Sequence, residues 1–531
     1  MKNNVLKKIL EVGIIFLFIG MGVVPSTGTV EIPSKAIIGR DILYVGGLGP
    51  GNYSKIQDAI DDANDGDTIF VYDDSSPYKG YIHVDKSVNI IGENKYTTVV
   101  FDDDYYCFSF DVDRINVSGF TLESTANCDY GIRIWETYNH SISNNIITGM
   151  GGGIDLTDSN NNSIMNNEIR DGGSGIDIEN SLYNQIGFNK FLDNNCGVRL
   201  RDYTKNNTVF DNSFENNGIA VWDFSYPNTF YGNLINGKPL IYLVDEQDKI
   251  LNDISAGEVI LIDCINITIQ NMEISNSTYG IELINSDKCT IVNNTIESNK
   301  YSGIHLIEDC DENSIINNNV NFNSADGISI YGDYFEPCEY NDIIGNNVIS
   351  NGVNGIYISD STNSMVSKNI VLKNGFRPYY TIVRSGITLE IRADNNKILQ
   401  NIVQDNYYGI SLWYSSDNLV SNNLIRNCTK TGIYIDESSK NMVEYNNFID
   451  NDKNARFIRY PTLKNYWRSN YWDSWIGIGP KLIWGLRMIQ IGVDRWGEPI
   501  YSPLPWINID WFPAKEPYII GGENEKEDIN R

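Results

Sequence analysis

The stretch from Gly153 to Ile178 reads GIDLTDSNNNSIMNNEIRDGGSGIDI and contains one complete copy of a repeat. The copy starts with Gly-apolar-x-apolar at Gly153, continues with Asn-x-Ile segments at Asn162 and Asn167, and starts again at Gly175. Its apolar residues alternate with polar ones in short segments, and Asn, Asp and Gly separate these segments. This is the pattern of short strands joined by turns. The stretch therefore predicts a repeating β structure.

The same repeat runs through the middle of the chain. Successive starts are 21–31 residues apart, except for one gap of 62 residues. A unit this short cannot close a core by itself, so the units must stack, with strands of neighbouring units about 4.8 Å apart. The sequence therefore predicts an all-β solenoid with rungs of about 22 residues. The starts are Gly131, Gly153, Gly175, Gly197, Gly218, Gly280, Gly303, Gly327, Gly355, Gly386, Gly409 and Gly432.

Asparagine recurs at two positions of each copy. The first position is Asn in ten of twelve copies, with His140 and Cys289 as the exceptions. The second is Asn in eleven copies, with Lys368 in the twelfth. Equivalent residues lie above one another in a stack, so their amides can hydrogen-bond in a ladder along it. We interpret both columns as structural rather than functional.

The sequences on both sides of the repeat predict caps that close the ends of the stack. Ile56, Ala59 and Ile60 fall on one face of a short helix, which would close the open end of the stack. Seven of the ten tryptophans lie between Trp467 and Trp511, and we interpret this segment as a cap on the last rung rather than a sugar-binding platform. The predicted organisation is signal peptide 1–28, amino-terminal cap and first coils 40–130, repeats 131–235, insertion 236–258, repeats 259–450, aromatic-rich cap 451–522 and disordered tail 523–531.

With these features, the chain resembles the right-handed parallel β-helix proteins of the pectate-lyase-like superfamily. More narrowly, it resembles the NosD-type family, whose repeat is also called the carbohydrate-binding and sugar-hydrolase repeat. Besides the repeat, the resemblance rests on Tyr53-Ser-Lys-Ile-Gln-Asp-Ala-Ile60, Gly66-Asp-Thr-Ile69, Ile90-Ile-Gly92 and Asn236-Gly-Lys-Pro-Leu-Ile-Tyr242. It implies a single-stranded right-handed parallel β-helix with a capping helix at its amino-terminal end.

The family name also implies copper delivery to nitrous-oxide reductase. The chain has only three isolated histidines and no methionine cluster, so its composition does not favour a copper site. Fold alone does not fix function in such a family.

The net charge and the amino-terminal residues indicate an exported protein that does not coat nucleic acid. The chain carries 69 acidic and 40 basic residues, a formal net charge of −29, which argues against a protein that coats nucleic acid. Basic residues at Lys2, Lys7 and Lys8 precede a short apolar run and small residues, the pattern of a secretory signal peptide, with an uncleaved anchor as the alternative. We therefore expect a secreted protein in an extracellular or periplasm-like compartment, with no membrane span after signal removal.

The eight cysteines have no CxxC spacing and so do not suggest a zinc site. Buried thiols are the favoured interpretation. Disulfides Cys107–Cys128 and Cys289–Cys310, each about one repeat apart, are the alternative.

The two x positions of Gly-apolar-x-apolar-x point away from the core. These outward positions carry carboxylates, guanidinium groups and aromatic rings, a mixture that suits an extended glycan because rings cover apolar sugar faces. The predicted substrate-binding residues are Arg133, Trp135, Arg201, Trp222, Tyr331, Tyr357, Trp413 and Tyr434.

The candidate catalytic residues are Asp155, Asp177, Glu179 and Arg199. Asp155 and Asp177 are one rung apart, so their repulsion should raise one pKa while the arginines lower both. The diagonal from Asp155 to Glu179 spans roughly 8 Å, within the range of an inverting glycosidase pair. A lyase would instead use a cation on the acids and Arg199 near the α-proton of the sugar. The alternative to both is a solvated face with weak ion pairs between rungs.

A run of three carboxylates, Asp102, Asp103 and Asp104, is the candidate site for a hard cation such as Ca²⁺, with an exposed acidic loop as the alternative. The polygalacturonase signature of NTD, DD and GHG elements is missing, and no pectate lyase or pectin esterase motif is evident. Three hypotheses follow. The protein binds carbohydrate or a cell-surface polymer, or it is a polysaccharide hydrolase or lyase, or it is a structural spacer at a surface.

Overall fold

The computed structural model describes residues 41–124, 129–222, 224–376, 384–459, 464–493, 495 and 498–520. The predicted signal peptide, the predicted tail and Cys128 lie outside these residues. In the described part of the chain, no helix is long and apolar enough to cross a bilayer.

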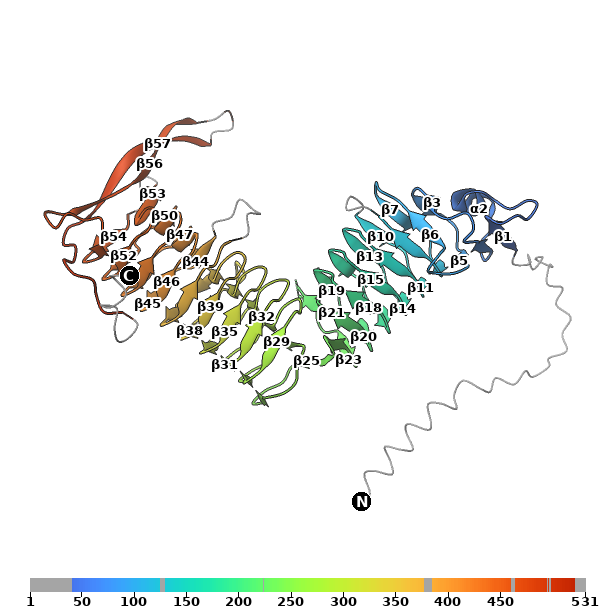
Figure 1. Ribbon diagram of the computed structural model, residues 1–531, viewed down its shortest axis with the longest axis horizontal. Coiled ribbons are helices and arrows are strands. Elements are labelled where there is room, and N and C mark those ends of the chain that lie inside the picture. The colour runs from blue at the N-terminus through green and yellow to red at the C-terminus, as the bar shows by residue number, and fades with distance from the viewer. Residues whose placement is uncertain are drawn as a thin grey trace, which may run out of the picture. The chain divides into compact units, whose positions relative to one another are not determined.

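The described chain is a parallel β-helix of about 18 turns, with rungs of about 23 residues and one short helix, as the repeat predicts. A regular rung contributes one strand to each of three faces, called here sheets 1, 2 and 3, whereas the rung of β25 (Lys238–Val244) and β26 (Ile250–Asn252) contributes only to sheets 1 and 2. Strands of successive rungs lie side by side in every face (Figure 1). Inward Ile, Val, Leu and Phe side chains from the three sheets fill the interior and are buried. Their hydrophobic burial is what holds the rungs together.

Sheet 1 carries the Gly-apolar-x-apolar strands. Its first part consists of β4 (Ile82–Val84), β7 (Tyr106–Phe110), β10 (Tyr130–Trp135), β13 (Gly152–Thr157), β16 (Ser174–Glu179), β19 (Cys196–Arg201) and β22 (Ile219–Val221). Its second part consists of β25 (Lys238–Val244), β27 (Glu258–Ile262), β30 (Ile281–Ile284), β33 (Ile304–Ile307), β36 (Ile328–Tyr331), β40 (Ile356–Ser359), β44 (Ser385–Glu390), β47 (Tyr408–Trp413), β50 (Thr431–Asp436), β53 (Ala455–Arg459) and β56 (Lys481–Val493).

Sheet 2 follows the first turn of each rung. Its first part is β1 (Ile42–Val45), β2 (Thr68–Val71), β5 (Asn89–Gly92), β8 (Asn116–Ser118), β11 (Ser141–Ser143), β14 (Ser163–Met165), β17 (Gln185–Gly187), β20 (Thr208–Phe210) and β23 (Thr229–Tyr231). Its second part is β26 (Ile250–Asn252), β28 (Thr268–Gln270), β31 (Thr290–Val292), β34 (Ser314–Ile316), β38 (Asp342–Ile344), β42 (Met365–Ser367), β45 (Lys397–Leu399), β48 (Leu419–Ser421), β51 (Met442–Glu444), β54 (Tyr466–Arg468) and β57 (Pro499–Asp510).

Sheet 3 completes each rung. Its first part is β3 (Tyr78–Lys79), β6 (Val99–Phe101), β9 (Thr121–Glu123), β12 (Ile146–Thr148), β15 (Glu168–Arg170), β18 (Lys190–Leu192), β21 (Ser213–Glu215) and β24 (Leu234–Ile235). Its second part is β29 (Glu273–Ser275), β32 (Thr295–Glu297), β35 (Asn319–Asn321), β39 (Asn347–Ile349), β43 (Ile370–Leu372), β46 (Ile402–Gln404), β49 (Leu424–Arg426), β52 (Asn447–Ile449) and β55 (Tyr471–Trp472). A further short pair, β37 (Cys338–Glu339) and β41 (Ser361–Thr362), lies at a turn.

A reversal of the chain divides the helix into two stacks. β24 pairs antiparallel with β25, and the parallel pairing resumes from β25 to β27 and from β26 to β28. Residues 236–258, predicted as an insertion, thus contain the first strands of the second stack. We call the rungs up to β24 the amino-terminal stack and the rungs from β25 the carboxy-terminal stack.

Asparagine ladders run along the turns, as predicted. In the amino-terminal stack, the backbone N–H of Asn167 donates to Asn189 Oδ1 at 2.9 Å, while Asn189 Nδ2 donates to the Ile164 carbonyl at 2.8 Å. Each buried amide therefore satisfies backbone groups of the preceding rungs, which would otherwise be costly to bury.

One rung corrects the predicted alignment. The twelfth ladder position is Asn369, which accepts from Asn346 N and donates its own N–H to Asn401 Oδ1, and not Lys368. Lys368 instead precedes the ladder residue with a positive φ of 56°.

Both ends of the described chain carry the predicted elements. Helix α2 (Ile56–Asp62) buries Ile56, Ala59 and Ile60 against the first rungs. At the other end Trp472 lies in the core and its Nε1 donates to Asp510 Oδ2 at 3.1 Å. Asp510 also accepts from the N–H of Asn470, the last ladder residue. The hairpin of β56 and β57 extends from this end (Figure 1). Several of its side chains, among them Trp484, are exposed.

Candidate functional site

The candidate residues of the amino-terminal stack lie on four neighbouring strands of sheet 1. The strand register places Arg133, Asp155, Asp177 and Arg199 in one column across β10, β13, β16 and β19. A second column, two residues further along each strand, contains Trp135, Thr157, Glu179 and Arg201. The structure therefore brings together the residues that the repeat aligns.

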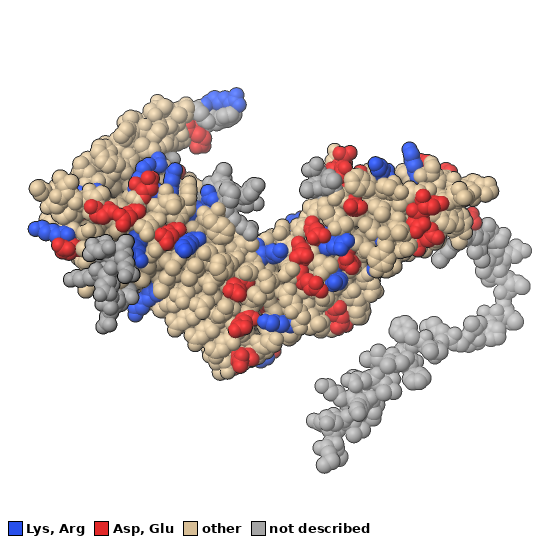
Figure 2. All heavy atoms as spheres, viewed as in Figure 1, with Lys and Arg blue, Asp and Glu red and all other residues tan. Residues whose placement is uncertain are grey.

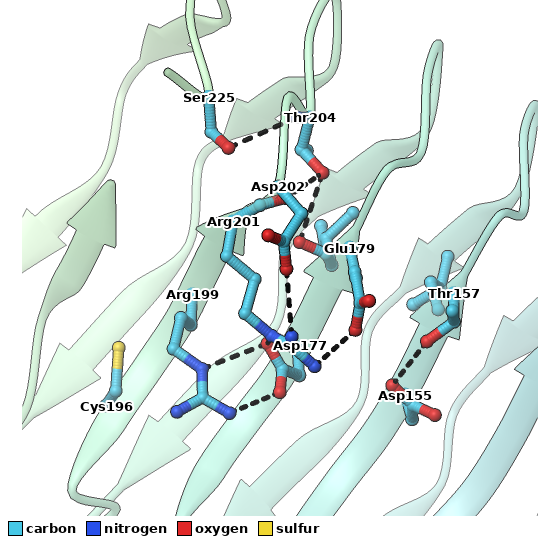
Figure 3. A network of polar contacts seen from close by, with 12 residues as sticks. Asp155, Thr157, Asp177, Glu179, Cys196, Arg199, Arg201, Asp202, Thr204 and Ser225 are labelled. Atoms are coloured by element: carbon cyan, nitrogen blue, oxygen red, sulfur yellow. Dashed lines mark hydrogen bonds and ion pairs between the residues drawn. The ribbon is translucent and has the colours of Figure 1, made fainter. Parts of the chain in front are cut away.

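Asp177 is the centre of a buried polar network (Figure 3). Arg199 binds both of its carboxylate oxygens, with Nε donating to Oδ1 at 3.0 Å and Nη2 donating to Oδ2. Arg201 Nε donates to Oδ1 at 3.3 Å, and the Tyr130 hydroxyl donates to Oδ2 at 2.9 Å. The expectation of a solvated face is therefore wrong at this point, because these side chains cover Asp177 completely.

Asp155 and Asp177 differ in charge behaviour although they are neighbours in the register. Burial raises the pKa of Asp155 to about 6, helped by the charge of Asp177. Burial acts in the same direction on Asp177, but the hydrogen bond and charge of Arg199, together with Arg201, lower the pKa of this carboxyl overall. Thr157 Oγ1 donates to Asp155 Oδ1 at 3.2 Å, and no described residue forms an ion pair with Asp155.

Glu179 is held by Arg201, whose Nη2 lies 2.5 Å from Glu179 Oε2 and whose Nη1 lies 3.0 Å from Asp202 Oδ2. Asp177 and Glu179 are thus both neutralised by arginine. The raised pKa of Asp155 suits its carboxyl group to proton transfer near neutral pH.

Tyr130 is a site residue that the sequence analysis missed. It occupies the position just before the repeat glycine, in register with Tyr106, Gly152 and Ser174. A Cβ on Gly152 would overlap the ring of Tyr130, so this glycine lets the ring lie across its rung and reach Asp177. The residues just before the repeat glycines form a third column, and this column could have identified Tyr130 from the sequence.

Arg133 lies between two rings at the amino-terminal edge of the network. Its guanidinium carbon is 5.3 Å from the centroid of Tyr106 and 5.1 Å from that of Trp135. No described carboxylate forms an ion pair with Arg133, in contrast to Arg199 and Arg201. Half of the Trp135 surface is exposed. An open aromatic ring beside an available cation is thus the most accessible part of the network.

On the other side, the network reaches the junction of the two stacks through Trp222. Arg199 lies 5.3 Å from the Trp222 ring centroid, and Trp222 Nε1 donates to the Tyr279 hydroxyl at 3.2 Å. The chain after β22 contacts the turn that follows β33. There the N–H of Phe224 and the hydroxyl of Tyr226 donate to the Glu308 carboxylate at 2.9 and 2.7 Å.

A pocket of about 560 Å³ opens at this junction, within the range of ligand pockets. Rings from several rungs line it. Tyr279 stacks on His305 with centroids 4.7 Å apart, and His305 contacts the edge of Tyr331 at 5.7 Å. Burial lowers the pKa of His305 to about 4, so this ring is neutral at physiological pH. The other lining residues are Trp222, Phe224, Tyr301, Ser302, Ile307, Glu308, Ala325, Asp326, Gly332 and Asp333.

The remaining predicted binding residues lie further along the carboxy-terminal stack. Tyr357 contacts Tyr331, with centroids 4.7 Å apart. Trp413 stacks on Tyr414, and the Tyr434 hydroxyl donates to Asp436 Oδ2 at 2.7 Å. The outward column of this stack is also more buried than predicted, since Glu282 and Ser329 are fully covered.

No group of three or more His, Cys, Asp or Glu side chains in the described ranges is placed to hold a metal ion. Asp102, the first of the three predicted cation ligands, turns its carboxylate toward its own loop, where Tyr105 N donates to Oδ2 at 3.1 Å. Cys289 and Cys310 are free buried thiols, as are the other five described cysteines.

Two family models match the sequence. Residues 60–252 match the family described as periplasmic copper-binding protein (NosD), and residues 257–423 and 379–465 match the right handed beta helix region. The described residues do not fit copper. The ring nitrogens of His140 have polar partners, Ile115 N on the preceding rung and Thr137 Oγ1. In the described ranges, neither His83 nor His305 lies in a group of three or more possible metal ligands.

Several solved structures match parts of the chain at low sequence identity and low TM-score. The A-module of Azotobacter vinelandii mannuronan C-5 epimerase AlgE6 is 13% identical over 77% of this chain and 92% of its own, with a TM-score of 0.29. A variant of the periplasmic alginate epimerase AlgG is 13% identical over 80% of this chain and 81% of its own, with a TM-score of 0.30. The alginate lyase of Paenibacillus sp. strain FPU-7 is 14% identical over 52% of this chain and 94% of its own, with a TM-score of 0.31. None of the curated proteins matches the sequence.

Proposed function

Because this chain is a right-handed β-helix protein with a NosD-family region, we propose that it is an exported protein that binds a glycan along sheet 1, between Arg133 and Trp222. The observation that carries the proposal is the accessible pair of Arg133 and Trp135 at the edge of the polar network. An exposed indole covers the apolar face of a sugar ring, and a guanidinium group donates several hydrogen bonds to its oxygens.

The charge distribution supports a glycan over a nucleic acid. On the face drawn in Figure 2, acidic and basic side chains are interspersed rather than gathered into a basic strip. Export is supported by the signal-like first residues and by the description of the matched family as periplasmic.

The test is retention of the protein lacking residues 1–28 on a panel of immobilised neutral, amino and acidic polysaccharides, with and without Ca²⁺. Trp135→Ala should weaken retention on the bound glycan about tenfold, equivalent to about 1.4 kcal/mol. Trp484→Ala, which removes an exposed tryptophan on the terminal hairpin, is the matched control and should bind like the wild type. Absence of retention on every polysaccharide would reject glycan binding and favour a structural spacer.

A second candidate function is cleavage of the same glycan, favoured by the pKa of about 6 of Asp155. A protonated Asp155 would donate its proton to the leaving oxygen of a glycosidic bond, while a water molecule adds to the anomeric carbon and loses its own proton to solvent. New chain ends should then appear at a rate that falls as the pH rises above about 6, and Asp155→Asn should abolish them without loss of retention. Asp342→Asn, on sheet 2, is the control. Retention without new chain ends in the wild type would leave the protein a binding module.

A further inference from the structure

The pocket at the junction of the two stacks has a different character from the arginine-rich network beside it. Its walls include four large aromatic side chains, Trp222, Tyr279, Tyr301 and Tyr331. Tyr279 and Tyr301 pack with ring centroids 5.3 Å apart, and Trp222 and Tyr301 with centroids 6.0 Å apart. Ring contacts of this kind fix the aromatic walls and leave a surface suited to the flat apolar face of a pyranose.

The polar groups of the pocket are acidic. Glu308, Asp326 and Asp333 line it, and none of the lining residues is Lys or Arg. Glu308 accepts hydrogen bonds from the Phe224 N–H and the Tyr226 hydroxyl, both on the segment that follows β22. A ligand carboxylate would meet three carboxylates and no cation there, which is strongly unfavourable in a partly desolvated site.

Asp326 provides a fixed acceptor in this pocket. Its Oδ1 accepts from both N and Nδ2 of Asn354 at 2.9 Å, which locks the carboxyl plane. Asn354 is itself held, since its Oδ1 accepts from Ser385 N and Thr388 Oγ1 at 2.9 Å. Within the described ranges no hydrogen bond is made to Asp326 Oδ2, although the carboxyl lines the pocket. Burial raises the pKa of Asp326 to about 6, so the group is ionised at neutral pH.

We propose that this pocket is a subsite for a pyranose ring that carries no carboxylate, with an amine-bearing sugar as its best ligand. The inference rests on the proposed glycan binding and specifies the sugar class at one position. The aromatic walls take the ring, and the carboxyl groups of Asp326 and Glu308 accept hydrogen bonds from an amine or a hydroxyl on it.

The experiment is isothermal titration of the protein lacking residues 1–28 with three hexasaccharides. They are β-1,4-linked glucose, β-1,4-linked glucosamine and α-1,4-linked galacturonate, all at pH 7. The glucosamine hexamer should bind most tightly, the glucose hexamer less tightly, and the galacturonate hexamer at least tenfold more weakly than glucose. Galacturonate binding as tight as that of glucose would overturn the assignment.

Variants locate the binding. Tyr331→Ala should weaken both favoured ligands at least tenfold, and Tyr331→Phe should restore wild-type affinity, which separates loss of the ring from misfolding. Asp326→Asn can keep the hydrogen bonds from Asn354 and should remove only the preference for glucosamine. Tyr96→Ala, at an exposed tyrosine near the first rungs, is the control and should change nothing.

Arg133→Gln tests the proposed function independently of the pocket assignment. If Tyr331→Ala and Asp326→Asn bind all three ligands like the wild type while Arg133→Gln loses binding, the pocket assignment fails and the proposed function stands. If the pocket variants lose binding and Arg133→Gln does not, the pocket assignment stands and the strip from Arg133 to Trp222 is not the site. No binding of any hexasaccharide overturns both.

Discussion

Removing Arg199 should destabilise the protein through the charge it leaves behind on Asp177. In the wild type, Asp177 is fully buried and receives two hydrogen bonds from Arg199, one from Arg201 and one from Tyr130. Breaking a buried pair by deleting one partner costs about 3–5 kcal/mol. Arg199→Met keeps part of the packing on Trp222, and Arg201 and Tyr130 remain on Asp177. We therefore expect a cost near the lower limit, about 3 kcal/mol at pH 7.

The cost of Arg199→Met should depend on pH, and the pKa of Asp177 sets the direction of this dependence. The folded-state pKa of Asp177 is lowered, so in the wild type its contribution to stability is present above the pKa of the unfolded state and is lost as the pH falls through the folded-state value. In Arg199→Met, burial dominates and raises the pKa of Asp177. The cost of the substitution should therefore shrink as the pH is lowered from 7 to 4.

The assay is native-state hydrogen exchange on peptides that cover β16 and β19, because a stack of rungs can open locally without unfolding as a whole. The matched control is the double variant Asp177→Asn/Arg199→Met, which removes the charge together with its partner and should cost about 1 kcal/mol. A cost below about 1 kcal/mol for Arg199→Met at pH 7, or one that does not change with pH, would place the pair among weak surface ion pairs and refute the reasoning.

Three further predictions concern single positions. Gly152→Ala should displace the Tyr130 ring, and we expect a loss of about 1.5–3 kcal/mol from the hydrogen bond to Asp177, measured by the same exchange experiment, with Tyr130→Phe giving a similar loss. Glu258 accepts N–H groups from Ile219 and Tyr279 at the junction, and burial raises its pKa to about 8 from 4.5. Its protonated form is thus the stable one in the folded state, so the free energy of unfolding should fall between pH 4.5 and 8 by at most about 5 kcal/mol, and thermal melting of Glu258→Gln should lack most of this slope. Asn189→Ala leaves Asn167 N and the Ile164 carbonyl without partners and should cost about 2–4 kcal/mol in urea unfolding, whereas Asn195→Ala, at an exposed side chain, should cost under about 0.5 kcal/mol.

The fold could be predicted because its cause is repeated in every rung. Inward residues such as Ile154 and Leu156 alternate with outward ones, and the spacing of the glycines sets the rung length. The exact position of a ladder residue within a rung is harder to predict from the sequence than the fold. At Asn363-Ser-Met365 the sequence offers Asn one position early, yet Ser364 occupies the ladder and Asn369 follows it. A shift of one residue exchanges the two faces of a strand, so packing rather than composition decides it.

The columns of the candidate site could be predicted, but the burial of its residues could not. Register follows from the repeat, so the vertical neighbours of Asp155 and Asp177 are fixed once the rungs align. Burial depends on how far a side chain from another position reaches across the surface. Tyr130 covers Asp177 only because the rung between them has glycine at the position that its ring crosses, a relation between three rungs that no single repeat contains.

The junction pocket shows why the distinctive chemistry of a solenoid arises where the repeat fails. Regular rungs present the same nearly flat surface again and again, and a flat surface encloses little of a ligand. Here β22 is the last strand of sheet 1 in the amino-terminal stack, and Trp222 follows it at the position opposite Arg201, the last residue of β19. The segment that follows binds Glu308 on the carboxy-terminal stack, and the parallel pairing restarts only after the reversal from β24 to β25. The pocket forms where the regular stacking of rungs is interrupted, and its aromatic and acidic lining comes from both stacks.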